Sequence, residues 1–290
     1  MKIFPISHNG ILNDIKKEFE VVKRIEDADA ILLWNDVNAI ERGIVRLCKS
    51  LKKKTIAFQH GRKGTSKYYE PFNEEISADK LLVWGEFDKE RLIKAGRDEN
   101  KIEVVGTTIW RNLKKRKKHS GTNVVFCPEH WDKPVQENFS VRDELRKLKK
   151  VKIITKVIDG HNLGAYDNPV FSNRNDWKHL KTCVEVLQTA DVVVGVSEST
   201  FELLAQAMDI PVVIMSEWEP KAFGGDLRYT DYPRLVSRAS HQATVENLNE
   251  VIKHALEYPE ELKKERKEVC EEEGGIHLDA VELMKKAIYG

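Results

Sequence analysis

The stretch from Thr189 to Met215, TADVVVGVSESTFELLAQAMDIPVVIM, constrains the fold more than any other part of the chain. Val192–Val196 is mostly β-branched, Phe201–Met208 carries apolar residues at helical spacing, and Pro211–Met215 is a second apolar run. This order predicts a strand, a helix and a strand, which together form a βαβ unit. Because the strand residues are apolar on both faces, we expect them inside a buried parallel sheet.

A hydroxyl-rich turn, Ser197–Thr200, joins the first of these strands to the helix. Ligands of parallel sheets bind beyond the carboxyl ends of the strands. A helix N-terminus offers unpaired N–H groups and the positive end of a dipole. Ser199 and Thr200 add hydroxyl donors, so the turn predicts a phosphate-binding site. The alternative is that Ser197 or Ser199 only caps the helix, as serine commonly does at this position.

The charge balance and the hydropathy exclude some partners. Charged residues make up 33% of the 290 residues, yet the formal net charge is +1, so no strong global field attracts nucleic acid and we predict no nucleic-acid partner. No apolar run is long enough to span a bilayer, and the first residues, MKIFPISHNG, lack a signal-peptide pattern. Both observations predict a cytoplasmic protein.

The cysteines and histidines form no recognisable metal motif. The four cysteines contain no CxxC pair, which predicts reduced thiols. The nine histidines form no HExxH, and none pairs with a cysteine at ligand spacing. We therefore predict neither a metal ion nor a cofactor.

The N-terminal half alternates short apolar runs with helical patterns, which is typical of a doubly wound α/β domain. The expected strands are Ile3–Ile6, Ala30–Trp34, Thr55–Phe58, Leu81–Trp84 and Ile102–Val105. The expected helices are one that ends at Val22, then Ile40–Leu51 and Phe87–Ala95. An Ala-Asp dipeptide precedes three buried strands of the whole chain, with its aspartate at Asp29, Asp79 and Asp191. We interpret these dipeptides as repeated turn chemistry at strand starts and not as metal sites.

A basic stretch, Lys114–Lys118, interrupts this alternation. We place a linker there and predict two Rossmann-like domains, residues 1–113 and 121–290, that face a cleft. A return of the last helix to the first domain is also considered. A solvated linker is the favoured interpretation of the charge, and contact with an anionic membrane surface or an acidic acceptor is the alternative.

The C-terminal half repeats the pattern. The expected strands before the central unit are Asn123–Cys127 and Val151–Thr155, with Lys156 at the start of the loop that follows the second. Ser140 is expected to cap a helix that runs through Leu148, and residues 162–175 are loop-like. The remaining expected helices are one that ends at Leu187, then Leu248–Leu256, Pro259–Glu272 and Leu278–Ile288.

Four passages together resemble one superfamily. They are Ser77–Gly106, Val124–Asp132, Ile153–His161 and Thr189–Met215. In this order they resemble the GT-B superfamily, the glycosyltransferases with two Rossmann domains. The likeness is nearest to the branch with CDP-glycerol glycerophosphotransferases, capsule-polysaccharide transferases and UDP-N-acetylglucosamine 2-epimerases.

The resemblance implies a metal-independent transferase in surface-glycan synthesis. Such an enzyme moves a sugar or polyol-phosphate group from a nucleotide-activated donor to a hydroxyl of a glycan or lipid-linked acceptor. It is expected in the cytoplasm, with peripheral contact to the inner face of the membrane as the alternative.

The resemblance also implies roles for individual residues. Hydroxyls and amides hold the diphosphate, cations neutralise it, and a glutamate holds the ribose. The residues expected to bind the donor are Lys156, Ser197, Glu198, Ser199, Thr200, Glu202 and His130. His60 is the expected base for the acceptor hydroxyl, with His8 second, because an imidazole pKa near 6.5 suits this role. Arg62 and Lys63 are expected to meet an anionic acceptor.

Three other functions stay open. The loop Glu129–Asp132 lacks the basic residue that is frequent in the family, and Leu204 stands where the family has a ribose-binding glutamate. A non-catalytic nucleotide-sugar or glycan-binding relative and a nucleotide-sugar epimerase are therefore alternatives. Gly195–Ser199 is one residue short of the G-x-S-x-G elbow. A serine hydrolase would use the residues Ser197, Asp226 and either His241 or His277.

Overall fold

The computed structural model describes residues 3–6, 23–33, 39–59, 78–94, 96–114, 116–128, 136–158, 165–172, 179–196, 199–215 and 238–290. Cα packing divides the chain into two units. Unit 1 comprises Met1–Thr108, Arg228–Thr230 and Glu271–Gly290, and unit 2 comprises Ile109–Leu227 and Asp231–Cys270. Each unit has its own parallel sheet and its own apolar core.

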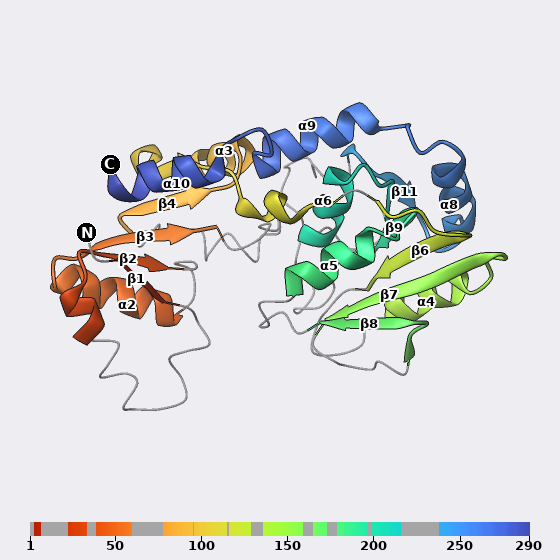
Figure 1. Ribbon diagram of the computed structural model, residues 1–290, viewed down its shortest axis with the longest axis horizontal. Coiled ribbons are helices and arrows are strands. Elements are labelled where there is room, and N and C mark those ends of the chain that lie inside the picture. The colour runs from red at the N-terminus through yellow and green to blue at the C-terminus, as the bar shows by residue number, and fades with distance from the viewer. Residues whose placement is uncertain are drawn as a thin grey trace. The chain divides into compact units, whose positions relative to one another are not determined.

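The sheet of unit 1 has its described strands in chain order (Figure 1). They are β1 (Ile3–Ile6), β2 (Ala30–Leu33), β3 (Lys54–Phe58), β4 (Lys80–Val83) and β5 (Ile102–Val104). Every neighbouring pair among them is parallel. All five lie within one residue of the predicted strands at each end, so these predictions are confirmed.

Helices cover both faces of this sheet. They are α2 (Ala39–Ser50), α3 (Glu86–Lys94) and α10 (Ala280–Tyr289), with a short 3₁₀ turn at η4 (Glu99–Lys101). A second 3₁₀ turn, η5 (Thr108–Asn112), begins at the last residue of this part of unit 1 and continues into unit 2. Val45 of α2 and Leu92 of α3 share a core with Leu81. Ile288 of α10 packs with Leu82, the next residue of β4, which faces the other way. The C-terminal helix therefore closes the face that α2 and α3 leave open.

The chain before α10 packs backbone against backbone in unit 1. A Cβ atom on Gly85 would lie 2.0 Å from the backbone oxygen of Glu272. Gly275 has a φ of +58°, and a Cβ atom there would lie 2.4 Å from the backbone oxygen of Trp84. Only glycine allows this approach and this φ, which explains why Gly275 ends the preceding helix.

The sheet of unit 2 has a different strand order. Its described strands are β6 (Thr122–Cys127), β7 (Val151–Ile158), β8 (Pro169–Ser172), β9 (Val192–Gly195), β10 (Val212–Met215) and β11 (His241–Ala243). They are arranged as β11-β10-β9-β6-β7-β8, and every neighbouring pair is parallel. The central βαβ unit predicted from the sequence is thus confirmed as β9, α6 and β10.

Helices also cover both faces of the second sheet. They are α4 (Gln136–Leu145), α5 (His179–Leu187), α6 (Thr200–Ala207) and α8 (Leu248–Glu257). A further helix, α9 (Lys263–Gly274), begins in unit 2, and its residues from Glu271 onward belong to unit 1. Val141 of α4 and Ile252 of α8 share a core with Val194. Leu187 of α5 and Phe201 of α6 share the opposite core with Val193. Among the helices that the structure describes, none is long and apolar enough to cross a membrane.

Two local predictions in this unit are wrong. Ser140 lies inside α4 and does not cap it, because the helix begins at Gln136 and its extent follows the burial of Val141 and Leu145, one turn apart. The region 162–175 is not only loop, since it contains β8. Pro169 argued against a strand in the sequence, but proline is tolerated as the first residue of an edge strand, which is the position it has in β8.

The Ala-Asp dipeptides tie neighbouring strands together. The Asp79 carboxylate accepts hydrogen bonds from the backbone N–H and the hydroxyl of Thr55, both at 2.8 Å. The Asp191 carboxylate accepts from the backbone N–H of Asn123 at 2.8 Å and from the Arg116 guanidinium at 2.6 Å. The interpretation as turn chemistry at strand starts is confirmed for these two aspartates. Arg116 of the basic stretch is likewise paired within unit 2.

Candidate functional site

The strand order of unit 2 reverses between β6 and β9. From β6 the chain proceeds outward through β7 and β8, and it then crosses to β9 and proceeds outward the other way through β10 and β11. Neighbouring loops diverge at such a switch point and leave a crevice beyond the carboxyl ends of the strands, where α/β sheets bind ligands. Helix α6 begins directly after β9 at this end. We call this region the switch-point edge, defined by Cys127, Lys156, Gly195 and Ser199.

Strand register aligns three of these residues. Phe126 is level with Thr155 of β7 and with Val194 of β9, and Cys127 is level with Gly195. The next residue of β7, Lys156, therefore stands at the level of Cys127 and Gly195. Because side chains of in-register parallel strands alternate together, Lys156 shares the face that α5 and α6 cover.

Lys156 is a buried cation inside a strand. The prediction that it begins a loop is wrong, because β8 pairs with residues 155–158 and extends β7 to Ile158. Its side chain is only 1% exposed, and Nζ donates to the backbone oxygen of Val157 at 3.0 Å. A buried ammonium group is stable only with hydrogen-bonding or charged partners, and lysine is rarely fully buried. A fully buried lysine at the switch-point edge is therefore unusual.

The pKa of the Cys183 thiol on α5 depends on two charged side chains near it. Burial raises the pKa of Cys183 from 9.0 to about 11, while the nearby Lys156 charge lowers this pKa and the Glu202 charge raises it. The Lys156 ammonium and the Glu202 carboxylate thus both lie within electrostatic reach of one thiol under α5 and α6. Sequence reasoning missed Cys183 because no motif contains it.

The start of α6 is a capping box. The Ser199 hydroxyl accepts from the backbone N–H of Phe201 at 3.1 Å. The Glu202 carboxylate accepts from the backbone N–H of Ser199 at 2.9 Å and also from the Ser199 hydroxyl. Glu202 is 1% exposed. The alternative that Ser199 caps the helix is confirmed, and a phosphate contact of Ser199 stays a prediction.

The absence of a side chain at Gly195 leaves room for the Glu202 carboxylate. A Cβ atom on Gly195 would lie 2.6 Å from Oε1 of Glu202. The carboxylate therefore lies against the end of β9, and any larger residue at 195 would displace it. An isolated glycine in a strand pattern is the sequence signal for such a close approach.

Several predicted site residues lie outside the described residues. They are His8, His60, Arg62, Lys63, His130, Ser197, Glu198 and Asp226. The residue before His60 is described: Gln59 accepts from the backbone N–H of Trp84 at 2.8 Å and donates to the buried carboxylate of Asp88. The first residue after β3 is therefore fixed by two hydrogen bonds in unit 1.

The two histidines of the hydrolase hypothesis lie in different units. His277 is exposed in unit 1. His241 begins β11 in unit 2, and its ring contacts that of His254 in α8. His241 thus belongs to the face that α4 and α8 cover, opposite to the face of α6.

No family model matches the chain, and no curated relative matches its sequence. Its structure nevertheless resembles solved structures over nearly its whole length. One is Anabaena Alr3699/HepE in complex with UDP-glucose, with a TM-score of 0.57, 11% identity, and coverage of 93% of this chain and 80% of that one. Another is the UDP-GlcNAc 2-epimerase of Neisseria meningitidis bound to UDP-GlcNAc, with a TM-score of 0.59, 13% identity, and coverage of 97% and 84%. The fold is that of GT-B proteins.

A third similar structure carries the name glycosyltransferase. It comes from Rickettsia africae, with a TM-score of 0.52, 14% identity, and coverage of 98% of this chain and 83% of that one. The relatives of this GT-B fold are nucleotide-sugar glycosyltransferases and epimerases. The predicted resemblance and the predicted fold class are confirmed at the level of the fold.

Proposed function

We propose that the chain is a GT-B transferase that binds a nucleotide-activated donor at the switch-point edge. The observation that carries this proposal is the reversal of strand order beside the N-terminus of α6, with buried Lys156 at the same level. Two of the similar structures are complexes with UDP-glucose and UDP-GlcNAc, which supports a nucleotide sugar as the ligand class. The product is a sugar or polyol-phosphate group joined to an acceptor hydroxyl.

The donor side must stabilise the leaving group. When the bond to the transferred group breaks, negative charge develops on the departing diphosphate oxygen. The α6 dipole and its first amides supply positive potential at that position, and the Lys156 ammonium adds a full charge. In this proposal no metal ion is needed for the transfer. His130 is the second cation, and Ser197 completes the turn.

Ser199 and Glu202 have a supporting role in this proposal. Both polar groups of Ser199 that face Glu202 are bonded within the capping box. Thr200 and Lys156 are therefore the first candidates for direct contact with the diphosphate. Glu202 holds the turn, and Glu198 is the better candidate for the ribose hydroxyls.

The acceptor side uses residues that follow β3. His60 takes the proton of the acceptor hydroxyl, and His8 is the second candidate for this base. The hydrogen bonds of Gln59 to Trp84 and Asp88 orient the chain just before His60. Arg62 and Lys63 meet an anionic acceptor, such as a phosphorylated glycan or lipid-linked chain.

A binding experiment tests the donor site. The thermal stability of the untagged protein is measured in EDTA with UDP, CDP, GDP, ADP and the matching monophosphates. A ligand at about 100 times its Kd stabilises the native state by about 2.7 kcal/mol. We expect one diphosphate, with UDP first, to stabilise the protein. No stabilisation by any nucleotide would contradict the proposal.

The variant Lys156→Met removes the buried charge and keeps the length of the side chain. We expect it to weaken diphosphate binding at least about tenfold, which corresponds to about 1.4 kcal/mol. Lys152→Met is the matched control, because Lys152 lies on the same strand and is exposed. Equal weakening in both variants would remove Lys156 from the donor site.

Turnover separates the remaining functions. A transferase consumes the donor faster when an acceptor is added, and His60→Gln slows that step. The similarity to the Neisseria epimerase makes epimerisation the second candidate. An epimerase converts the nucleotide sugar to a stereoisomer without an acceptor. Tight binding with neither reaction would support the non-catalytic relative.

A further inference from the structure

Two histidines and a glutamate meet on the face of the unit 2 sheet that carries α8. They are His241 at the start of β11, His254 in the last turn of α8, and Glu261 in the turn after that helix. One ligand atom from each lies within 4.8 Å of the other two. We propose that His241, His254 and Glu261 bind a divalent transition-metal ion, with zinc as the best match to two imidazoles and a carboxylate.

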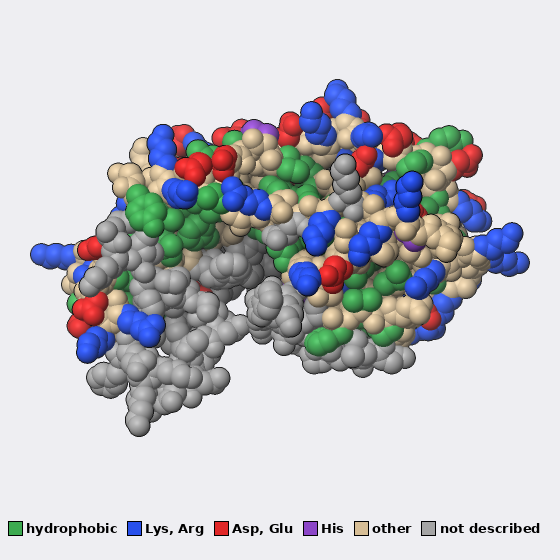
Figure 2. All heavy atoms as spheres, viewed as in Figure 1, with side chains coloured by type: hydrophobic (Ala, Val, Ile, Leu, Met, Phe, Trp, Pro, Cys, Tyr) green, Lys and Arg blue, Asp and Glu red, His purple; other side chains and the backbone are tan. Residues whose placement is uncertain are grey.

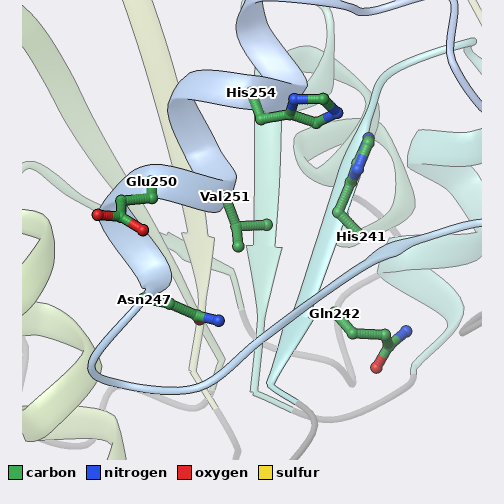
Figure 3. A pocket seen from close by; sticks show the side chains of 6 residues that line it. All are labelled: His241, Gln242, Asn247, Glu250, Val251 and His254. Carbon is green, nitrogen blue, oxygen red and sulfur yellow. The ribbon is translucent and has the colours of Figure 1, made fainter.

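The present geometry needs little change to hold the ion. Nε2 of His254 lies 2.6 Å from Oε2 of Glu261, and the rings of His241 and His254 are 5.6 Å apart at 77°. Figure 3 shows the two rings facing one another from β11 and α8. Zinc ligands at 2.0–2.2 Å in a tetrahedron stand about 3.3 Å from one another. His254 and Glu261 would separate slightly, and the ligand atom of His241 already lies within 4.8 Å of both.

His241 supplies an independent observation. Its Nε2 is buried and has no hydrogen-bond partner within the described part of the chain. A buried polar atom without a partner is destabilising, and native proteins rarely retain one without reason. A metal ion beside Glu261 and His254 would give this nitrogen the partner it lacks.

Arg266 holds the turn that carries Glu261. Its buried guanidinium donates to the backbone oxygens of Pro259 at 2.8 Å and Glu261 at 2.7 Å. It also pairs with Asp209 at 2.7 Å. The backbone of Glu261 is thus anchored before any metal arrives, and such preorganisation favours binding. Arg266 is a positioning residue in this proposal.

The cluster has room for a further ligand. A pocket of about 320 Å³ lies beside it, lined by His241, Gln242, Asn247, Glu250, Val251 and His254 (Figure 3). Zinc sites with three protein ligands keep a fourth position for water or a small anion. This ion is separate from the proposed transfer chemistry, because α6 and the switch-point edge belong to the other face of the sheet. The cluster escaped sequence reasoning since strand, helix and turn each contribute a single ligand.

Zinc titration of the full-length, untagged protein tests the proposal. After dialysis against EDTA, calorimetry and metal analysis should find one tight equivalent of zinc. Cobalt(II) should give the visible absorption bands of a tetrahedral site with nitrogen and oxygen ligands. We expect His254→Ala and Glu261→Gln each to weaken zinc binding at least about tenfold. His277→Ala is the matched control, because His277 is exposed and lies in unit 1.

The variant His241→Leu separates loss of zinc binding from loss of folding. Because Nε2 of His241 makes no hydrogen bond and its burial is destabilising, the metal-free variant should unfold at no lower a temperature than the metal-free wild type. Its zinc-induced stabilisation should disappear. Absence of a tight zinc equivalent in the wild type, or zinc binding that survives all three substitutions, would overturn the proposal. Nucleotide binding measured on the same samples in EDTA reports on the donor site separately.

Discussion

The two sheets differ in how their strands are ordered, and this difference separates their roles. In unit 1 the described strands follow the chain from β1 to β5, whereas in unit 2 the order reverses between β6 and β9. Right-handed crossovers in a sheet that grows one way put all its helices on one face. α2 and α3 accordingly share one face, and α10 returns from the C-terminal end of the chain to cover the other.

In unit 2 the reversal itself places helices on both faces of the sheet, so no helix has to return from a distant part of the chain. α4 and α8 lie on one face and α5 and α6 on the other. The same reversal defines the switch-point edge, where parallel α/β sheets generally bind ligands, so the place of the proposed ligand site follows from topology. The described strands of unit 1 contain no such reversal. We propose that unit 1 contributes to function through residues that follow its strands, with His60 as the predicted base.

The largest predicted effect concerns the closure of unit 1. Gly85→Ala would drive a Cβ atom into the backbone oxygen of Glu272, and we expect the free energy of unfolding to fall by about 3 kcal/mol. Gly43→Ala is the matched control. Gly43 is exposed in the middle of α2 with nothing within 4 Å of its added Cβ, so this change should stabilise by about 0.5–1 kcal/mol. Urea denaturation measures both, and equal effects would refute the close approach of the C-terminal segment.

Next in size is the contact between Gly195 and Glu202 in unit 2. Gly195→Ala should cost about 2 kcal/mol, because the new Cβ atom would lie 2.6 Å from the carboxylate. In a Glu202→Ala background the same change should cost under about 0.5 kcal/mol, since the obstructing atoms are gone. Urea denaturation of the four proteins completes this double-mutant cycle. Additive effects would mean that the two residues do not touch.

A smaller effect separates capping from ligand binding at Ser199. Ser199→Ala should destabilise the protein by about 1 kcal/mol, and Ser199→Asn should restore most of this, because asparagine also caps helices well. Thermal unfolding without ligand measures whether the stability falls in the order wild type, Ser199→Asn, Ser199→Ala. If Ser199→Asn is stable but binds the diphosphate at least about tenfold more weakly than wild type, the hydroxyl contacts the ligand as well. Unchanged binding would restrict Ser199 to the cap.

The sequence was sufficient for most buried elements and insufficient for edges. Strands such as Val192–Gly195 are apolar on both faces, so their composition alone identifies them. β8 and β11 are short edge strands with polar residues, and their pairing partners are invisible in the sequence. Missing β8 also misplaced Lys156, because the pairing with β8 is what extends β7.

The site shows the same limit. The helix Thr200–Ala207 and its cap at Ser199 were predictable, because a strand, a polar segment and a helical pattern follow one another in the sequence. The approach of Cys183 to Lys156 and Glu202 was not, because three separate elements meet there. The surface charges show a similar limit. In Figure 2 acidic and basic side chains intermingle on the face shown, in keeping with the small net charge. Net charge describes such a surface, but it does not locate a buried cation.

The last predicted effect depends on pH and compares one thiol from each unit. Burial raises the pKa of Cys48 in α2 and of Cys183 in α5 from 9.0 to about 11. Both thiols are therefore more strongly held in the neutral form in the folded protein than in the unfolded chain. The corresponding stability is fully present below pH 9 and is lost as the pH rises from 9 towards 11. We expect each thiol to account for a loss of about 1.4 kcal/mol at pH 10.

Urea denaturation at pH 8 and pH 10 measures this loss, and Cys48→Ala and Cys183→Ala should each reduce it. Lys156→Met extends the test to the switch-point edge. The Lys156 charge lowers the pKa of Cys183, so its removal should raise that pKa further. The pKa of Cys48 should not respond, because the charges that act on it are those of Asp79 and Lys53 in unit 1. Thiolate absorbance in single-cysteine proteins reads the two pKa values separately. An unchanged Cys183 pKa would mean that the Lys156 ammonium does not lie near α5, and the proposed donor site would lose its buried cation.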